Sequence, residues 1–198
     1  MNPETPFQLF AIAVFALTLT IGMTHRLRAN AAQPDDDTSP KDEGSLLLTA
    51  RRIFGLLIWL STFAYLINPA WLAWAHLPLP AWLRWGGGAL MVVCLPLIYW
   101  LFSSLGKNIT GTVAIRKEHT LVTHGPYRWV RHPLYSVSLL MFTGFSLLAA
   151  NWFIALVAFV TLIILVLRTP IEEAKLIERF GDEYRQYMHN TGRYVPRI

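Results

Sequence analysis

The sequence contains one cysteine and few charged residues. Cys94 lies in an apolar stretch and has no second cysteine to pair with, so neither a disulfide framework nor a cysteine metal cluster can form. Charged residues make up 15% of the 198 residues, whereas an ordinary soluble domain has about 25%. The sequence also has no glycine-rich dinucleotide motif and no phosphate-binding loop. These absences argue against a soluble enzyme with a nucleotide-binding fold.

Apolar residues are abundant instead, at 54% of the chain with a mean hydropathy of +0.40. Long apolar segments cover residues 7–23, 53–75, about 85–103 and 134–167. The last is too long for a single crossing of a ~30 Å hydrocarbon core at about 1.5 Å per residue, and Asn151 near its centre predicts a tight helical hairpin. The sequence therefore predicts an all-α integral membrane protein with about five transmembrane helices, of which the last two form the hairpin.

Several residues predict details within and between these segments. Asn68 and Pro69 would kink or interrupt the second apolar segment. The glycines at 86–88 favour close helix packing over a ligand role. Residues 25–52 are predicted to form a polar loop, because the stretch from His25 to Ser45 cannot bury enough apolar surface to fold alone. Glu4, rather than a basic residue, precedes the first segment, so an uncleaved helix is favoured over a signal peptide cleaved near 29–32.

The basic residues predict the orientation in the membrane. Lys and Arg number none before Phe7, five in the first loop, one in the second, five in the third, none at the hairpin tip and six in the tail. The positive-inside rule then places the N-terminus outside and the C-terminus in the cytosol. The net charge of +5 is accordingly a topology signal with attraction to anionic membrane lipids, not a nucleic-acid footprint.

Titratable residues concentrate after the third apolar segment, in residues 105–135 and 168–198. Gly125 and Pro126 predict a turn. Pro133 suits the first position of a helix, with His132 near its N-cap. A structural interpretation is open for this loop, in which its arginines enforce topology and its aromatic rings lie at the membrane interface.

Arg168 lies within one helical turn of Glu172, where the hairpin leaves the membrane. An ionisable residue at membrane depth is a functional candidate. The alternative is a capping box that starts a new helix, with Thr169 as N-cap, Pro170 at the first position and Glu172 at the third. Further on, apolar and aromatic residues recur at helical spacing with a break near Gly181, which predicts one or two amphipathic helices.

An ordered set of short motifs runs through this half of the chain. It reads His119-x-Leu-Val, Gly125-Pro-Tyr, Arg131-His-Pro-x-Tyr and, after the hairpin, Arg168-x-x-x-Glu-Glu. The set resembles the isoprenylcysteine carboxyl methyltransferase family and is similar, more loosely, to the phospholipid N-methyltransferases. The resemblance covers residues 105–198 and implies a cofactor-binding methyltransferase core there, preceded by an N-terminal transmembrane part at 1–104.

The resemblance implies S-adenosylmethionine as cofactor, held in a cytosolic pocket formed by the third loop, the hairpin exit and the C-terminal helices. By position in the motifs, the implied cofactor-binding residues are His119, Thr120, Leu121, Val122, Tyr127, His132, Pro133, Leu134, Tyr135 and Glu172. Arg168 matches the arginine that the family assigns to the methyl acceptor, so it is the implied catalytic and substrate-binding residue.

The implied acceptor is a lipophilic molecule from the bilayer, such as a prenylated cysteine with a free carboxylate. A phospholipid amine or a small thiol is an alternative, and either would need a general base, for which His119, His124 and His132 are available. A sterol-type membrane reductase using NADPH and a non-enzymatic membrane subunit are further alternatives. A metal site is not expected, because no two histidines have the four-residue spacing of a helical zinc motif.

Overall fold

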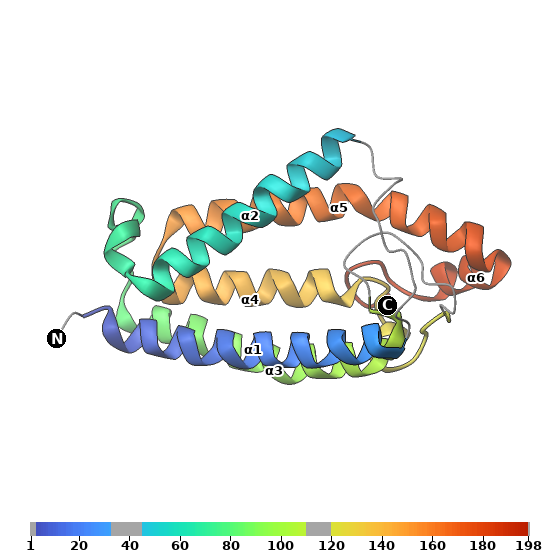
Figure 1. Cartoon of the computed structure of the whole chain (residues 1–198), viewed down its shortest axis with the longest axis horizontal. Helices are drawn as coiled ribbons and strands as arrows, with labels where there is room; N and C mark the ends of the chain where they lie inside the picture. The colour runs from blue at the N-terminus through green and yellow to red at the C-terminus, as the bar shows by residue number, and fades with distance from the viewer. Residues whose placement is uncertain (1–2, 33–44, 110–119, 198) are drawn as a thin grey trace.

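The computed structural model describes residues 3–32, 45–109 and 120–197, and most of these lie in helices (Figure 1). Among them there is no strand, only two isolated bridges. The α-helices are α1 (Thr5–Ala32), α2 (Ser45–Ile67), α3 (Ala81–Leu105), α4 (Pro133–Ala149), α5 (Trp152–Phe180) and α6 (Asp182–Asn190). Three short 3-10 helices connect them, η1 (Pro69–Ala75), η2 (Gly106–Asn108) and η3 (Gly125–Arg128).

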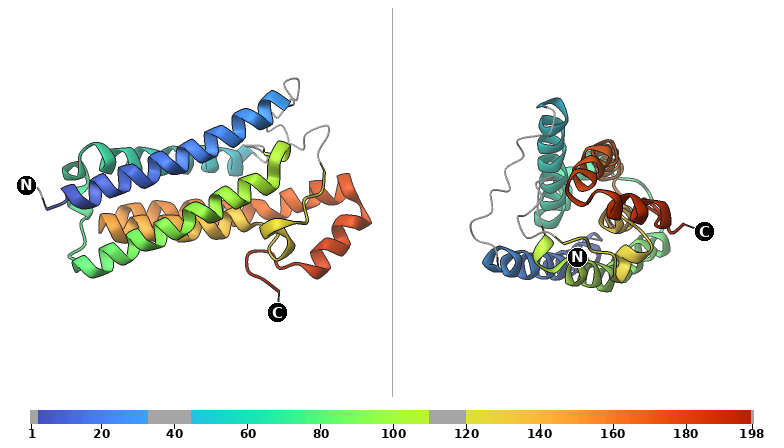
Figure 2. Two further views of the ribbon diagram at one scale, coloured as in Figure 1. Left: turned by 90° about the horizontal axis from the view of Figure 1, so that it is seen from below. Right: turned by 90° about the vertical axis from the view of Figure 1, so that its right-hand side faces the viewer.

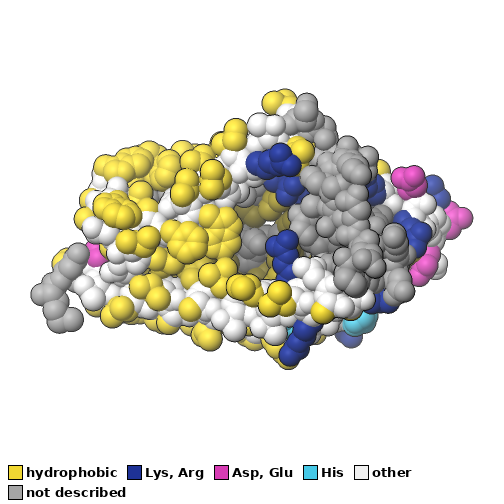
Figure 3. Space-filling model, viewed as in Figure 1, with side chains coloured by type: hydrophobic (Ala, Val, Ile, Leu, Met, Phe, Trp, Pro, Cys, Tyr) yellow, Lys and Arg dark blue, Asp and Glu magenta, His cyan; other side chains and the backbone are white. Residues whose placement is uncertain are grey.

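Helices α1 to α5 run up and down along one axis, as two views show (Figures 1 and 2). α1, α2, α3 and α5 are long and apolar enough to cross a membrane. α4 is a shorter apolar helix of 17 residues, about 25 Å at 1.5 Å per residue. Hydrophobic side chains cover much of the bundle's flank, whereas Lys and Arg lie toward the end that carries α6 (Figure 3). The predicted number of five crossings depends on α4 and stays a prediction.

The polar loop predicted at 25–52 is shorter than expected at both ends. α1 continues to Ala32 and α2 already begins at Ser45. The stretch from His25 to Ala32 is rich in Arg, Leu and Ala and contains no glycine or proline, so helix propensity extends α1 beyond its apolar segment. The prediction at Asn68 and Pro69 is confirmed, because α2 ends at Ile67 and the Asn68 side chain accepts a hydrogen bond from Ala70 N (3.1 Å) at the start of η1.

Small residues bring α3 and α4 together, as predicted for the glycine run. A Cβ atom on Gly87 would lie 2.5 Å from the carbonyl oxygen of Gly144, and one on Gly144 would lie 2.6 Å from that of Gly87. Gly88 is close to Phe10, whereas Gly86 faces open space. Of the three glycines, Gly87 thus permits a backbone contact between α3 and α4 that a larger residue would prevent, and Gly88 leaves room for the side chains of Phe10 and Leu148.

The hairpin predicted at 134–167 is confirmed. α4 ends at Ala149, Ala150 adopts a left-handed conformation (φ 48°), and Asn151 caps α5 by accepting a hydrogen bond from Ile154 N (3.1 Å). The Asn151 amide also donates to Leu72 O (3.0 Å), which ties the hairpin tip to η1. A polar residue in the middle of an apolar run therefore marks the turn between two helices.

A buried ion pair closes the same end of the bundle. Arg84 at the start of α3 donates to both carboxylate oxygens of Glu4 (2.8 and 2.6 Å) and to Leu148 O (2.9 Å). Tyr65 of α2 donates to the Glu4 carboxylate (3.3 Å), and the Arg84 guanidinium lies 3.6 Å from the centre of the Phe7 ring. The pair joins the ends of four helices. α6 and the C-terminal tail lie at the opposite end (Figure 1).

Candidate active site

Helix α5 carries the first part of the site and does not break at Pro170. It is continuous from Trp152 to Phe180, and Thr169 is buried inside it, donating its hydroxyl to Leu165 O (3.1 Å). The predicted capping box is therefore wrong. Tertiary contacts accompany the continuous helix. Tyr194 of the tail donates to the Thr169 hydroxyl (2.7 Å), and Tyr135 of α4 donates to Glu172 in the next turn of α5. Arg168 and Glu172 consequently lie on one helical face.

Four of the residues named by the motifs meet around Glu172. Arg168 Nη1 lies 3.0 Å from Glu172 Oε1, the Tyr135 hydroxyl donates to Glu172 Oε2 (2.7 Å), and His132 Nδ1 lies 3.6 Å from the same oxygen. The Glu172 side chain keeps 17% of its surface exposed, compared with 7% for Arg168. α4 and α5 thus bring residues 37 positions apart into direct contact at the membrane-exit end of the hairpin.

Glu173, the next residue, is in a different environment. Its side chain is only 4% exposed and accepts hydrogen bonds from Arg131 Nε (3.0 Å) and from Arg193, while His132 Nε2 lies 3.4 Å away. The hydrogen bond to Glu173 raises the pKa of Arg193. The motif analysis gave no role to Glu173, Arg131 or Arg193. The only sequence signal for Glu173 is that it directly follows Glu172 in the last motif.

Three rings lie beside these carboxylates. The His132 and Tyr135 rings are stacked, with centroids 5.5 Å apart and an interplanar angle of 17°. The Tyr194 ring lies 6.0 Å from His132 and 6.4 Å from Tyr135. His132 occupies the N-cap position of α4 and Pro133 its first position, as predicted, although the His132 side chain makes no capping hydrogen bond. Leu134 packs against the hydrophobic core.

The C-terminal tail pairs with the segment that leads into α4. Arg131 N donates to Gly192 O (2.8 Å), His132 N donates to Arg193 O (3.0 Å), and Gly192 N donates to Trp129 O (3.2 Å). A Cβ atom on Gly192 would lie 1.8 Å from Val195 O, so the close return of the chain requires glycine here. The tail therefore helps to fix the position of His132.

Asn108 holds the start of the first motif. Its side chain is buried, donates to Thr120 O (3.1 Å) and to the Thr120 hydroxyl (3.2 Å), and accepts from Thr120 N (3.3 Å). The sequence analysis missed Asn108, whose only signal is its position after an apolar helix. Val122 packs against the core, and His119 lies outside the described residues.

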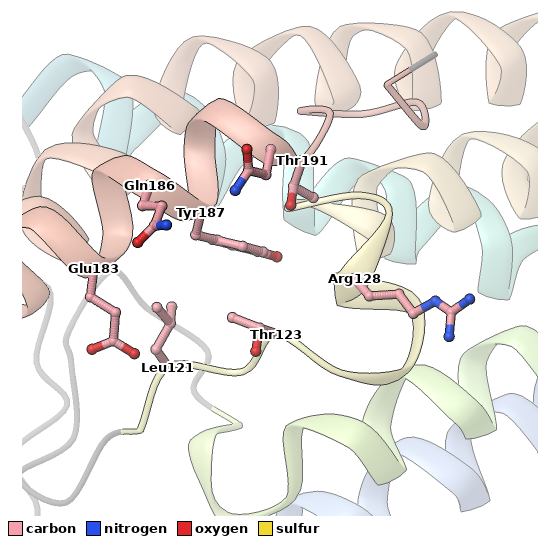
Figure 4. Close-up of a pocket in the computed structure, with 8 residues that line it drawn as sticks. Leu121, Thr123, Arg128, Glu183, Gln186, Tyr187 and Thr191 are labelled. Atoms are coloured by element: carbon pink, nitrogen blue, oxygen red, sulfur yellow. The ribbon is translucent and has the colours of Figure 1, made fainter.

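A cleft of about 280 Å³ separates this motif from α6 (Figure 4). Leu121, Thr123 and Arg128 line one side, and α6 and Thr191 line the other with Glu183, Gln186, Tyr187 and Asn190. The Tyr187 hydroxyl donates to Tyr127 O (2.6 Å). Burial raises the pKa of Tyr127, and it raises the pKa of Tyr187 to about 12, so both phenols are neutral near pH 7. The resemblance implied a pocket that includes the C-terminal helices, but the sequence analysis named none of the α6 residues that line this cleft.

Arg131 connects the cleft with the Glu172 cluster. Its Nε donates to Glu173, while Nη1 donates to Met188 O (2.8 Å) and to the carbonyl of Thr191, which lines the cleft. No hydrogen bond or ion pair in the described parts of the chain joins Leu121 or Tyr127 to Glu172. The motif residues therefore form two neighbouring groups. Among residues 3–32, 45–109 and 120–197, no group of three His, Cys, Asp or Glu could hold a metal ion.

The family model described as phospholipid methyltransferase matches residues 82–183, more than half of the chain and both groups of motif residues. The chain belongs to this family. It is also similar to the probable protein-S-isoprenylcysteine O-methyltransferase of Oryza sativa subsp. indica, with 35% identity over 117 residues, which cover 56% of this chain and 60% of that protein. The predicted resemblance to the isoprenylcysteine carboxyl methyltransferases is thus confirmed.

Two further relatives are named for two different acceptors, isoprenylcysteine in a protein and methanethiol. The protein-S-isoprenylcysteine O-methyltransferase of Schizosaccharomyces pombe is 36% identical over 101 residues, covering 47% of this chain and 41% of that protein. Methanethiol S-methyltransferase 1 of Bradyrhizobium diazoefficiens is 37% identical over 70 residues, covering 35% of this chain and 24% of that protein. The chain therefore spans at most about three fifths of the first curated relatives it matches.

The fold extends beyond the motif region. The structure of the eukaryotic intramembrane Ras methyltransferase ICMT matches with a TM-score of 0.56 and 25% identity over 96% of this chain and 68% of that one. Together with four helices long and apolar enough to span a membrane, this match identifies an all-α integral membrane protein. The predicted fold class is confirmed.

Proposed function

We propose that this chain is an S-adenosylmethionine-dependent methyltransferase that acts on a lipophilic acceptor drawn from the bilayer. The observation that carries the proposal is the meeting of His132, Tyr135, Arg168 and Glu172 where the apolar hairpin leaves the membrane. Family membership supports the type of reaction. The residues at 105–198 supply this cluster, and residues 1–104 supply the helices that support it.

The chemistry of Glu172 fits one end of the cofactor. A carboxylate has about four lone-pair sites, and Arg168 and Tyr135 each occupy one, on different oxygens. With 17% of its surface exposed, Glu172 retains acceptor capacity for the ammonium group of the cofactor's amino acid. Tyr135, whose ring is stacked on His132, is an aromatic ring of the kind that stabilises a cation near its face.

S-adenosylmethionine supplies a methyl group on a sulfonium, which an acceptor displaces in line. The residues of this chain contribute mainly position, and holding two reactants in the right geometry is worth several kcal/mol, up to roughly 10. Arg168 presents a planar guanidinium whose fork matches a carboxylate or phosphate. Its ion pair with Glu172 places the proposed acceptor-binding group within one helical turn of the proposed cofactor-binding group.

Glu173 and its arginines serve as positioning residues in this proposal. They fix the turn before α4 against α5 and the tail, and thereby fix His132 and the start of α4. Because Glu173 and Arg131 already satisfy each other in a buried pair, and the exposed Arg193 is bound to the same carboxylate, these groups are poor candidates for direct ligand contacts. The roles of Thr120, Leu121, Val122 and Tyr127 in cofactor binding belong to the same proposal.

The orientation follows from the distribution of basic residues. The start of α1 and α6 lie at opposite ends of the bundle (Figure 1), and the positive-inside rule puts α6 in the cytosol and the N-terminus outside. The acceptor would enter from the bilayer near the cytosolic interface. Figure 3 shows a hollow between α1 and α2 with Lys and Arg side chains at its edge, a suitable place for a lipid with an anionic group.

We favour a carboxylate acceptor such as that of a prenylated cysteine, because Arg168 can orient its oxygen and no base is needed. Transfer forms the oxygen–methyl bond, breaks the sulfur–methyl bond, and yields a methyl ester and S-adenosylhomocysteine. A phospholipid amine and a small thiol are second candidates, because the family model is described as phospholipid methyltransferase and one relative is named methanethiol S-methyltransferase. For those acceptors His132, which lies between Glu172 and Glu173, is the base available.

The test uses purified protein in detergent with S-adenosylmethionine labelled in the methyl group. We expect label to enter an S-prenylated cysteine with a free carboxylate and not the matched compound whose carboxylate is amidated. Arg168→Ala should abolish this transfer, whereas the matched surface variant Arg179→Ala should retain it. Transfer to amine lipids or thiols alone would replace the carboxylate proposal, and transfer to none of the three classes would contradict the proposed function.

A further inference from the structure

A groove of about 300 Å³ runs between α4 and α5, within the apolar part of the bundle. We propose that it holds one acyl chain of an anionic phospholipid from the leaflet at the α6 end, with the phosphate bound by Arg197 in the tail that follows α6 (residues 191–197). This lipid is distinct from the proposed methyl acceptor, and its site does not depend on the proposed function.

The groove has small residues at its floor and larger ones at its rim. Ser146 of α4 and Ala158 of α5 are buried, whereas Leu139 and Phe159 are exposed beside them. The Ser146 hydroxyl donates to Phe142 O within its own helix (2.7 Å), so it does not make the floor polar. The groove is therefore almost wholly apolar, and it opens on the flank of the bundle.

The size of the groove selects its occupant. α5 is long and apolar enough to cross a membrane, and at hydrocarbon depth the apolar occupants are transmembrane helices and alkyl chains. One turn of an α-helix is about 5.4 Å long and 10 Å across, so it takes up about 400 Å³, which is more than the whole groove. An apolar cavity of about 150 Å³ holds a benzene ring. Twice that volume suits an alkyl chain.

The groove faces away from the proposed acceptor-binding residue. Phe159 and Arg168 are nine residues apart on α5, which at about 100° per residue places them on opposite sides of the helix. In the end-on view, α6 and the tail lie on the side of the bundle away from α1 and α2 (Figure 2), whereas the hollow proposed for the acceptor lies between α1 and α2 (Figure 3). A lipid in the groove and an acceptor at Arg168 therefore approach α5 from different sides.

The two faces that line the groove lead to the tail. Thr169 lies two helical turns after Leu162 and thus on the same face of α5, and its hydroxyl accepts a hydrogen bond from Tyr194 (2.7 Å). On α4, Ser136 lies one turn before Leu139 and donates to Tyr194 O. Tyr194 is therefore bound to both helices at the end of the groove that is nearer to α6.

Arg197 supplies a positive charge beside this end of the groove. It is exposed and donates to His189 O through one of its N–H groups, so further donors are open to a phosphate, which a guanidinium fork matches well. The rise from Thr169 back to Leu162 is about 10 Å, and an acyl chain covers about 15 Å, half of the hydrocarbon core. A lipid with its phosphate at the tail thus reaches the groove with its chain.

The experiment uses the purified full chain in phosphatidylcholine nanodiscs with a small fraction of phosphatidylglycerol that carries a photoactivatable diazirine in one acyl chain. After illumination, mass spectrometry of the peptides should find crosslinks concentrated on residues 139–147 and 155–162. Ala155→Phe should lower this crosslinking severalfold, because the new ring fills the groove from an exposed position. Ala16→Phe, an exposed change on α1, is the matched control and should leave it unchanged.

Competition by unlabelled lipids tests the headgroup. Phosphatidylglycerol should displace the labelled lipid more effectively than phosphatidylcholine by about fivefold, the effect of one arginine near a membrane surface. Arg197→Gln should remove this difference. Arg28→Gln, an exposed change near the end of α1, is the matched control and should retain it.

Several outcomes would overturn the lipid site. Crosslinks spread evenly over the lipid-facing sides of all helices, or unchanged in Ala155→Phe, would show that the groove holds no particular chain. Equal displacement by the two lipids, or a preference retained in Arg197→Gln, would overturn the phosphate contact. Crosslinks absent from the groove in a protein that elutes as a dimer would show that a second copy covers this flank instead. Monodisperse elution and unchanged helical circular dichroism show that each variant is folded.

Discussion

The two ends of the bundle use the same kinds of residue in different ways. At the end near the hairpin tip, Arg84 and Glu4 are joined by two hydrogen bonds, and the pair also contacts Leu148 O, Tyr65 and Phe7. At the end with α6, the two adjacent carboxylates of Glu172 and Glu173 have different partners and different exposure. The comparison shows that an ion pair between helices does not by itself indicate a functional site. The Arg84–Glu4 pair acts as a structural clamp, which here means that it holds helix ends together.

The α6 end differs in that one carboxylate is saturated and the other is accessible. Glu173 is 4% exposed and surrounded by Arg131, Arg193 and His132, whereas Glu172 is 17% exposed and lies beside Arg168 and Tyr135. Glu173 is therefore the more saturated of the two. Glu172 resembles Glu4, which is 20% exposed and is also bound by one arginine and one tyrosine. What distinguishes Glu172 from Glu4 is its place among the motif residues. A nearby cleft also distinguishes the α6 end.

The largest effect on stability should come from Glu173→Gln. The change leaves the buried Arg131 without its carboxylate, and breaking a buried pair typically costs about 3–5 kcal/mol. We expect a clear fall in the thermal unfolding midpoint of the detergent-purified protein. Glu178→Gln, an exposed change on the same helix, should leave the midpoint unchanged. Equal midpoints for the two variants would show that Glu173 is not a clamp.

Arg84→Met should destabilise the protein less and leave the site intact. Glu4 is 20% exposed, so water recovers part of the lost interaction, and we expect a cost of about 2 kcal/mol. The double variant Glu4→Gln/Arg84→Met should be more stable than the single one, because it buries no unpaired charge. Affinity for S-adenosylhomocysteine should stay within twofold of wild type in calorimetry. A large loss of affinity would mean that the two ends are coupled.

Asn108→Ala should have the smallest effect on stability and a visible effect on the site. The change removes the hydrogen bonds to Thr120, and because Thr120 is exposed and water replaces part of them, we expect a cost of about 1 kcal/mol. Because Thr120 begins the first motif in the described structure, we expect severalfold weaker binding of S-adenosylhomocysteine. Ser103→Ala, an exposed change at the end of α3, is the control. Wild-type affinity in Asn108→Ala would separate the Asn108 contact from cofactor binding.

Much of the fold could be predicted because its signals are local. Apolar segments gave the long helices, Asn151 gave the hairpin turn, and Asn68 with Pro69 gave the end of α2. The errors occurred where local and tertiary preferences disagree. Thr169 and Pro170 have the pattern of a helix start, yet contacts from Tyr194 and Tyr135 accompany a continuous α5.

The candidate site could be predicted in part. Arg168 and Glu172 are four residues apart, so their pairing on a helix is readable from the sequence. The partners of Glu173 come from positions 42 residues earlier and 20 residues later, and no local pattern indicates such pairs. The contact of Asn108 with Thr120 and the cleft at α6 likewise depend on tertiary structure, so no local sequence pattern indicates them. The cofactor and acceptor roles of these residues stay predictions.

The central claim is that Glu172, unlike Glu173 and Glu4, contacts a ligand. Calorimetric titration of S-adenosylhomocysteine into wild type and Glu172→Gln tests it without requiring the acceptor. Hydrogen bonds to charged groups contribute about 1.5–3 kcal/mol, so the variant should bind roughly 10- to 150-fold more weakly. Because the variant also removes the carboxylate beside the buried Arg168, its melting temperature should fall, and the titration is made at a temperature at which both proteins are folded. Binding of equal strength by the two proteins would contradict the claim.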